Sequence, residues 1–248
     1  MSQFALFGQP PLVPNKSFKP TPHRGINSVL CATLHAVAAP PWGGLTPALG
    51  LTLTMTEADK SWEKFLHPET LRTNLISISL FITAFEMFKA QVIKKPETFF
   101  CNGFDENRLT ISKDYASDVL SKNKSKLYAS LLWLKEMDAI DQSDIDVFDS
   151  IRKHRNEVAH EPLEFIASHT REFDISKFQS LISLLKKIEV WWLINYEIAI
   201  DPDMLPEDAD IDGIVPGPIW SLQLMLDIAL GNEPVEGYYY NSFMQRKA

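Results

Sequence analysis

Apolar residues recur at helical spacing through most of the chain beyond about residue 55. Residues 124–138 repeat apolar side chains every three or four positions, and a longer stripe follows Asp174, a good N-cap residue, to about residue 198. That stripe comprises Phe178, Leu181, Ile182, Leu185, Ile188 and Trp192. A last apolar helix is expected over residues 220–230, ended by Gly231. The pattern predicts an all-α fold in which helices joined by short loops pack antiparallel.

The region between residues 56 and 110 contains the most continuous apolar run of the chain. A short helix containing Trp62 is expected first, and His67-Pro68 should break it. The next helix should run over residues 70–93 and end before Pro96. Its apolar part is shorter than a bilayer requires and is interrupted by polar residues, so we expect a buried core helix and no membrane-spanning segment. Residues 96–110 should form an irregular loop.

A polar stretch, residues 148–162 (FDSIRKHRNEVAHEP), carries the candidate chemistry. Ser143 and Asp146 have the form of a capping box, and Pro162 forbids helix just beyond, so one helix of roughly five turns is expected. Its apolar side should comprise Ile145, Phe148, Ile151, Val158 and Ala159.

Two polar features mark that helix. Arg155 falls in the middle of the apolar side, where a guanidinium costs several kcal/mol unless it is paired and hydrogen-bonded. Arg152, Asn156 and His160 follow one another four residues apart and form a polar strip along the edge of the same face. Arg155 therefore needs either a partner or a function.

The pattern of Arg155 and Asn156, three further residues and His160 resembles the signature of the HEPN superfamily, in which an arginine and a polar residue precede a histidine in a helical bundle. Residues 84–90 (AFEMFKA) are similar to the long early helix of HEPN domains with its inward acidic residue, which implies that Glu86 is the counter-charge of Arg155. The resemblance covers roughly residues 55–230.

In its active members, this resemblance implies a metal-independent endoribonuclease of the toxin or phage-defence kind, whose site is completed by homodimerisation. Other members are inactive or only bind. The implied partners are RNA, a second copy of the chain and an antitoxin protein, and no cofactor or metal is implied. The rival hypothesis is a non-catalytic HEPN-like module that binds nucleotide, RNA or protein, and the third is a helical scaffold in which Arg155 and Glu86 form a core ion pair.

Each candidate residue has a chemical role and a structural alternative. His160 suits both proton transfers of RNA cleavage near neutral pH, and the fork of Arg155 suits phosphate oxygens. Asn156 would orient the imidazole or the phosphate, or is a solvated helix residue. Arg152 is a phosphate anchor or a surface charge, and Glu86 is a structural partner of Arg155 in preference to a proton-transfer group.

Composition limits the kinds of binding and the cellular compartment that are expected for this site. A net charge of −8 argues against non-specific coating of nucleic acid but allows a local basic site. The two cysteines, Cys31 and Cys101, lack the spacing of a metal or redox pair, so free thiols in a reducing, cytoplasmic compartment are expected. Residues 208–213 copy the first half of a calcium loop, but Ile219 stands where a bidentate glutamate is required, so no calcium site is predicted.

The first 54 residues differ from the rest of the chain. They contain no Asp or Glu and hold half of the 16 prolines and half of the 10 glycines, so a poorly ordered leader is expected. Residues 15–25 and 43–46 resemble the translated attachment-site repeat of an integron cassette. The expected organisation is a leader over 1–54, a helical domain over 55–231 and a C-terminal tail over 232–248.

Overall fold

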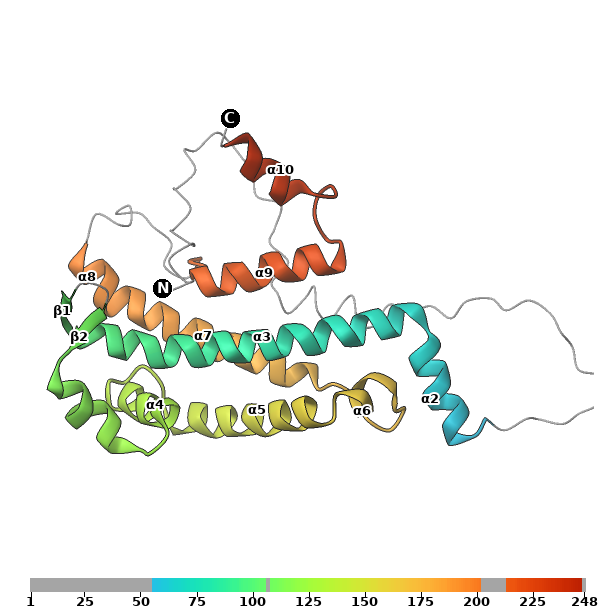
Figure 1. Cartoon of the computed structure of the whole chain (residues 1–248), viewed down its shortest axis with the longest axis horizontal. Coiled ribbons are helices and arrows are strands. Elements are labelled where there is room, and N and C mark those ends of the chain that lie inside the picture. The colour runs from blue at the N-terminus through green and yellow to red at the C-terminus, as the bar shows by residue number, and fades with distance from the viewer. Residues whose placement is uncertain (1–54, 106–107, 202–212, 247–248) are drawn as a thin grey trace, which may run out of the picture. The chain divides into compact units, whose positions relative to one another are not determined.

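One long helix, α3 (Pro68–Phe99), lies at the centre of the fold and contacts α2, α4, α5, α6, α7 and α9 (Figure 1). The structure is a computed structural model and describes residues 55–105, 108–201 and 213–246, so the predicted leader lies outside the described residues. Helix α3 begins at Pro68, after His67, whose ring nitrogen accepts a hydrogen bond from the Thr70 amide. Its buried residues are Ser77, Ile78, Leu80, Phe81, Ala84, Phe85, Phe88, Val92 and Pro96.

The end of α3 corrects the prediction made from Pro96. The helix continues through this residue to Phe99, although proline has no amide to donate to the carbonyl four residues earlier. Phe99 contacts the rings of Trp133, Trp192 and Tyr196 at centroid distances of 5.8, 6.0 and 4.8 Å. We infer that this aromatic packing holds the last turn in helical form against the local preference of Pro96.

A hairpin replaces the irregular loop expected over residues 96–110. Strands β1 (Cys101–Asp105) and β2 (Arg108–Ile111) pair antiparallel, with an irregular register between Cys101 and Gly103. Asn102-Gly103, a dipeptide typical of turns, therefore lies inside a strand, with Asn102 at a bulge. A π-helical turn, η2 (Tyr115–Val119), and a 3₁₀ turn, η3 (Leu120–Lys122), follow. The rest of the described chain is helical or in loops and turns, which confirms the all-α prediction.

Five other helices begin and end close to the predicted residues. They are α2 (Glu57–Leu66), α4 (Lys126–Glu136), α5 (Gln142–His160), α7 (Ile175–Trp192) with the π-helical turn η4 (Leu193–Glu197) and α8 (Ile198–Ile200), and α9 (Gly217–Leu230). Helices α6 (Pro162–Ala167) and α10 (Tyr238–Gln245) were not predicted, and α6 corrects the expectation that Pro162 forbids helix, because proline fits the first position of a new helix. Asp174 caps α7 as predicted, and all six residues of the predicted stripe are buried. Gly231 ends α9 in the left-handed conformation, with φ +68°. The predicted tail contains α10, whose Tyr239 donates a hydrogen bond to Asp227 of α9.

Helix α5 differs from its prediction at two points. Its N-cap is Asp141, which exchanges hydrogen bonds with Asp144, so the capping box lies two residues before the predicted one at Ser143. Ala159, which was expected on the buried side, is exposed. His154 is buried instead, with 8% of its surface accessible. His154 was not among the residues expected on this side.

Helix α3 is long and apolar enough, by length and composition, to cross a membrane. The same test is passed by core helices of globular domains, and 44% of its most apolar window is buried in this structure. Its contacts with α4, α5, α7 and α9 on several sides are sufficient to explain an apolar composition of this length.

A buried ion pair joins the end of α3 to α7. The Lys95 ammonium lies 2.8 Å from Oε2 of Glu189, which is only 4% exposed, and 3.3 Å from Oε1 of Glu197. We expect Lys95→Met to lower the free energy of unfolding by roughly 3 to 5 kcal/mol, because it leaves a buried carboxylate without its counter-ion. Lys94→Met, at the neighbouring exposed lysine, is the matched control, and denaturant unfolding measures both.

The stability lost in Lys95→Met should depend on pH, because Glu189 titrates. Burial raises the pKa of the Glu189 carboxyl above its ordinary 4.5, and Lys95 opposes that rise. Without Lys95 the folded state favours the protonated carboxyl still more. The loss of stability caused by Lys95→Met should therefore be small below pH 4.5 and should grow as pH rises through the pKa of Glu189 in the folded state. A loss that shrinks with rising pH would contradict this assignment.

His154 supplies a second pH-dependent contribution to stability. Its ring lies among Phe81, Phe165 and Phe173, and its Nε2 accepts a hydrogen bond from the Asp174 amide at 3.3 Å. Burial lowers the pKa of His154 below 6.5, so the neutral ring is favoured in the fold and its stabilisation is lost as pH falls through that lowered pKa. We expect the free energy of unfolding of the wild type to fall on acidification relative to that of His154→Phe, which lacks the titrating ring, and parallel stability profiles would contradict this.

Candidate functional site

The candidate residues lie on the last two and a half turns of α5, which ends at His160. Glu161 caps this end, and Pro162 starts α6. Because α5 turns by about 100° per residue, Arg152, Asn156 and His160 advance by only about 40° each and share one side. Arg155 and His160 are about 140° apart around the helix axis. Helix geometry therefore separates the two most specific residues of the motif.

Arg155 is paired with Glu86 across the contact between α5 and α3. Its Nη2 lies 2.6 Å from Oε1 of Glu86, and its guanidinium carbon lies 5.2 Å from the centroid of the Phe85 ring. The Nε atom is buried and has no hydrogen-bond partner among the described residues. The structure thus brings together the two residues that the sequence pattern pairs.

This pair lies at the edge of the core, whereas Arg155 was expected in its middle. The side chains of Arg155 and Glu86 are 28% and 44% exposed, and Glu86 also contacts Lys89 at 3.2 Å. An ion pair with this exposure contributes about 0 to 1 kcal/mol, far less than a buried one. Arg155 is therefore a partly exposed cation, and a ligand could displace its partner Glu86.

Asn156 and Arg152 are exposed beside this pair. Oδ1 of Asn156 lies 3.4 Å from Nη1 of Arg155, a long and weak hydrogen bond. Arg152 lies over the ring of Tyr128 in α4, 5.3 Å from its centroid, and 3.8 Å from Asp149. The Tyr128 hydroxyl donates to Asp149, and burial together with this bond raises the pKa of Tyr128 to about 12. Arg152 is therefore held over α4 by a tyrosine that stays protonated.

His160 is exposed at the end of α5, and within the described chain its ring makes no hydrogen bond, ion pair or ring contact. It lines an open hollow of about 430 Å³. The other lining residues are Glu161, Pro162, Leu163, Glu164 and Arg171. His160 is the only candidate residue at this hollow among those described, since Arg155 and Asn156 do not line it.

Arg171 is the residue at this hollow that sequence reasoning missed. Its Nη2 lies 2.6 Å from Oε2 of Glu161, and its guanidinium carbon lies 5.2 Å from the centroid of the Phe165 ring. The α6 turn and the loop after it return the chain to the end of α5. No spacing rule joins Arg171 to His160, because the path between them is an irregular loop and a short helix.

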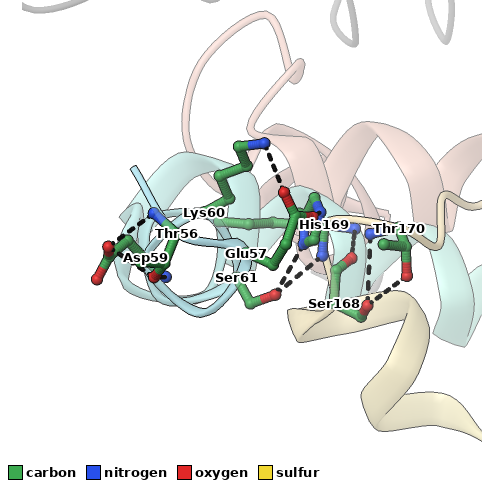
Figure 2. A network of polar contacts seen from close by, with 9 residues as sticks. Thr56, Glu57, Asp59, Lys60, Ser61, Ser168, His169 and Thr170 are labelled. Atoms are coloured by element: carbon green, nitrogen blue, oxygen red, sulfur yellow. Dashed lines mark hydrogen bonds and ion pairs between the residues drawn. The ribbon is translucent and has the colours of Figure 1, made fainter. Parts of the chain in front are cut away.

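The loop that carries Arg171 is fastened to α2 by the polar contacts in Figure 2. Nδ1 of His169 lies 3.0 Å from the Ser61 hydroxyl, and its Nε2 pairs with Glu57. Lys64 donates to the backbone carbonyls of Ser168 and Arg171 at 2.8 and 2.6 Å, and burial lowers its pKa. Because Glu57 is 71% exposed and shared with Lys60, we interpret Ser61, His169 and Glu57 as a clamp and not as a catalytic relay.

Metal ligation has no candidate in the part of the chain that the structure describes. No three His, Cys, Asp or Glu side chains are grouped there in a way that could hold an ion. Residues 208–212, which copy part of a calcium loop, lie outside the described residues. The chemistry available at the site is that of an imidazole, guanidinium groups, an amide and the carboxylates of Glu86, Glu161 and Glu164.

Comparison of the chain with protein-family models, with curated proteins and with solved structures gives no match. The interpretation of the site therefore depends on its residues and their geometry.

Proposed function

We propose that this chain is a metal-independent endoribonuclease of the toxin or phage-defence type, with a composite site formed by two copies of the chain. The observation that carries the proposal is the exposed imidazole of His160, which has no partner among the described residues and lies on the same side of α5 as Asn156 and Arg152. The resemblance of Arg155, Asn156 and His160 to the HEPN motif supports the same function. The toxin or defence context is supported by that resemblance and by the cassette-like leader.

RNA supplies its own nucleophile in this reaction. A base takes the proton of the 2′-hydroxyl, the 2′-oxygen attacks phosphorus, and an acid protonates the departing 5′-oxygen, which leaves a 2′,3′-cyclic phosphate. Histidine serves both steps near neutral pH, and arginine stabilises the charge on the phosphorane. One chain offers one motif histidine, so a two-fold dimer that brings two His160 rings into one cleft would supply both the base and the acid.

The ion pair between Arg155 and Glu86 favours the rival hypothesis, a non-catalytic binding module. Its guanidinium is held by Glu86 and Phe85 and is free for substrate only if Glu86 releases it. A module that uses the strip of Arg152, Asn156 and His160 for binding would need no such release. The two hypotheses differ in whether RNA is cleaved.

We expect the purified full chain to cleave RNA in the presence of EDTA, with 2′,3′-cyclic phosphate at the product ends. His160→Ala and His160→Gln should each lower the rate by about 100-fold or more, because general acid–base groups contribute at least that much. Lys153→Ala, an exposed change on the same helix, should alter the rate by less than about threefold. Equal cleavage by wild type and both His160 variants would contradict the assignment, and no cleavage by any of them would support the binding module.

A composite site also predicts a dependence on protein concentration. Specific activity should rise with concentration and level off where sedimentation analysis shows the dimer to be complete, because a monomer holds only half of the catalytic groups. Constant specific activity across a concentration range in which the chain changes from monomer to dimer would contradict the composite site.

A further inference from the structure

The hollow beside His160 contains a cation that the motif does not include. Arg171 lines it together with His160, whereas Arg155 projects about 140° away around α5 and is bound to Glu86. A phosphate next to the His160 imidazole would therefore meet Arg171 of the same chain first. The hollow is open to solvent and has a volume of about 430 Å³, which is ample for a phosphate group.

Three contacts hold Arg171 in place before any ligand arrives. The face of Phe165 supports the guanidinium, and Phe165 itself is buried. Lys64 fixes the backbone carbonyl of Arg171 at 2.6 Å, and the clamp in Figure 2 fastens the preceding residues to α2. The backbone at Arg171 is therefore fixed, and the Phe165 ring orients the guanidinium, which reduces the ordering cost of binding.

We propose that Arg171 binds the phosphodiester that His160 acts on, and that Glu161 occupies the same guanidinium until RNA displaces it. This inference rests on the proposed function and adds a binding residue to it. Glu161 presents a carboxylate to the guanidinium at 2.6 Å, which is the contact that a phosphate oxygen would make. Both partners are substantially exposed, at 41% and 52%, so the ion pair can exchange with a ligand.

The acidic side chains at the hollow determine how such a site behaves. Glu161 competes for Arg171, and Glu164, which also lines the hollow, repels an anion. A site of this composition binds a phosphate weakly until Glu161 is displaced. Removing the Glu161 charge should therefore improve binding, while removing Arg171 should impair it.

The test is the binding of a fluorescent 2′-O-methyl oligoribonucleotide, which cannot be cleaved, to the full chain. We expect Arg171→Ala to weaken binding at least tenfold and Glu161→Gln to strengthen it severalfold. Arg72→Ala is the matched control, since Arg72 is an exposed arginine whose partner Glu69 lies 2.8 Å away, and it should change affinity by less than twofold. Weaker or unchanged binding by Glu161→Gln would overturn the proposal, because a purely structural ion pair suffers from the loss of either partner.

Arg171→Lys separates binding from folding, because it keeps a charged side chain over Phe165 but loses the bidentate fork. Its thermal unfolding should match that of the wild type, its KM for RNA should rise, and kcat should fall less. If the wild type cleaves RNA and both Arg171 variants have the same KM as the wild type, the role of Arg171 is wrong but the proposed nuclease function stands. Arg171-dependent binding without cleavage would overturn the nuclease and leave the phosphate site intact.

Discussion

The burial of α3 determines where every candidate side chain lies. Phe148 of α5 stacks between Phe85 and Phe88 of α3, with centroid distances of 5.9 and 5.2 Å, and all three rings are buried. Burial of each such ring stabilises the fold by about 1.5 to 3 kcal/mol, so α5 cannot rotate about its axis without losing this contact. Arg155 follows Phe148 by seven residues, or within about 20° of the same direction, and therefore meets Glu86 next to Phe85. The same rotation turns His160 outward.

This arrangement divides the motif between two tasks. Arg155 contributes to the contact between α5 and α3, whereas His160 lies exposed at the end of α5, where its ring makes no hydrogen bond, ion pair or ring contact within the described part of the chain. Bringing Arg155 to a substrate beside His160 requires its release from Glu86, whether the guanidinium belongs to the same chain or to a second copy. Arg171 already lies at the hollow at the end of α5, carried there by the loop after α6, and has to exchange only Glu161.

Helical periodicity predicted most of the fold, because burial of one face of a helix depends only on residues near in sequence. The six buried positions of α7 follow from it, and Pro162 and Gly231 mark where α5 and α9 end. Prediction failed where contacts between distant residues override a local rule. Aromatic packing carries α3 past Pro96, and strand pairing draws Asn102 into a bulge. For the candidate site, the motif spacing singled out Arg155 and His160 as candidates. The position of Arg171 depends on contacts between α2 and the loop after α6, including the hydrogen bond from Lys64, which no local pattern encodes.

The acidic character of the chain restricts how it would use this site. With a net charge of −8, the chain as a whole repels RNA at long range, so the proposed affinity would have to come from a few short contacts. A site in which Glu161 competes for Arg171 weakens binding to isolated phosphates further. The proposed site would favour RNA that can reach His160 and displace Glu161 at the same time. A flexible, unpaired strand does this more readily than a duplex. Selectivity would then follow from the accessibility of the phosphodiester more than from its base sequence.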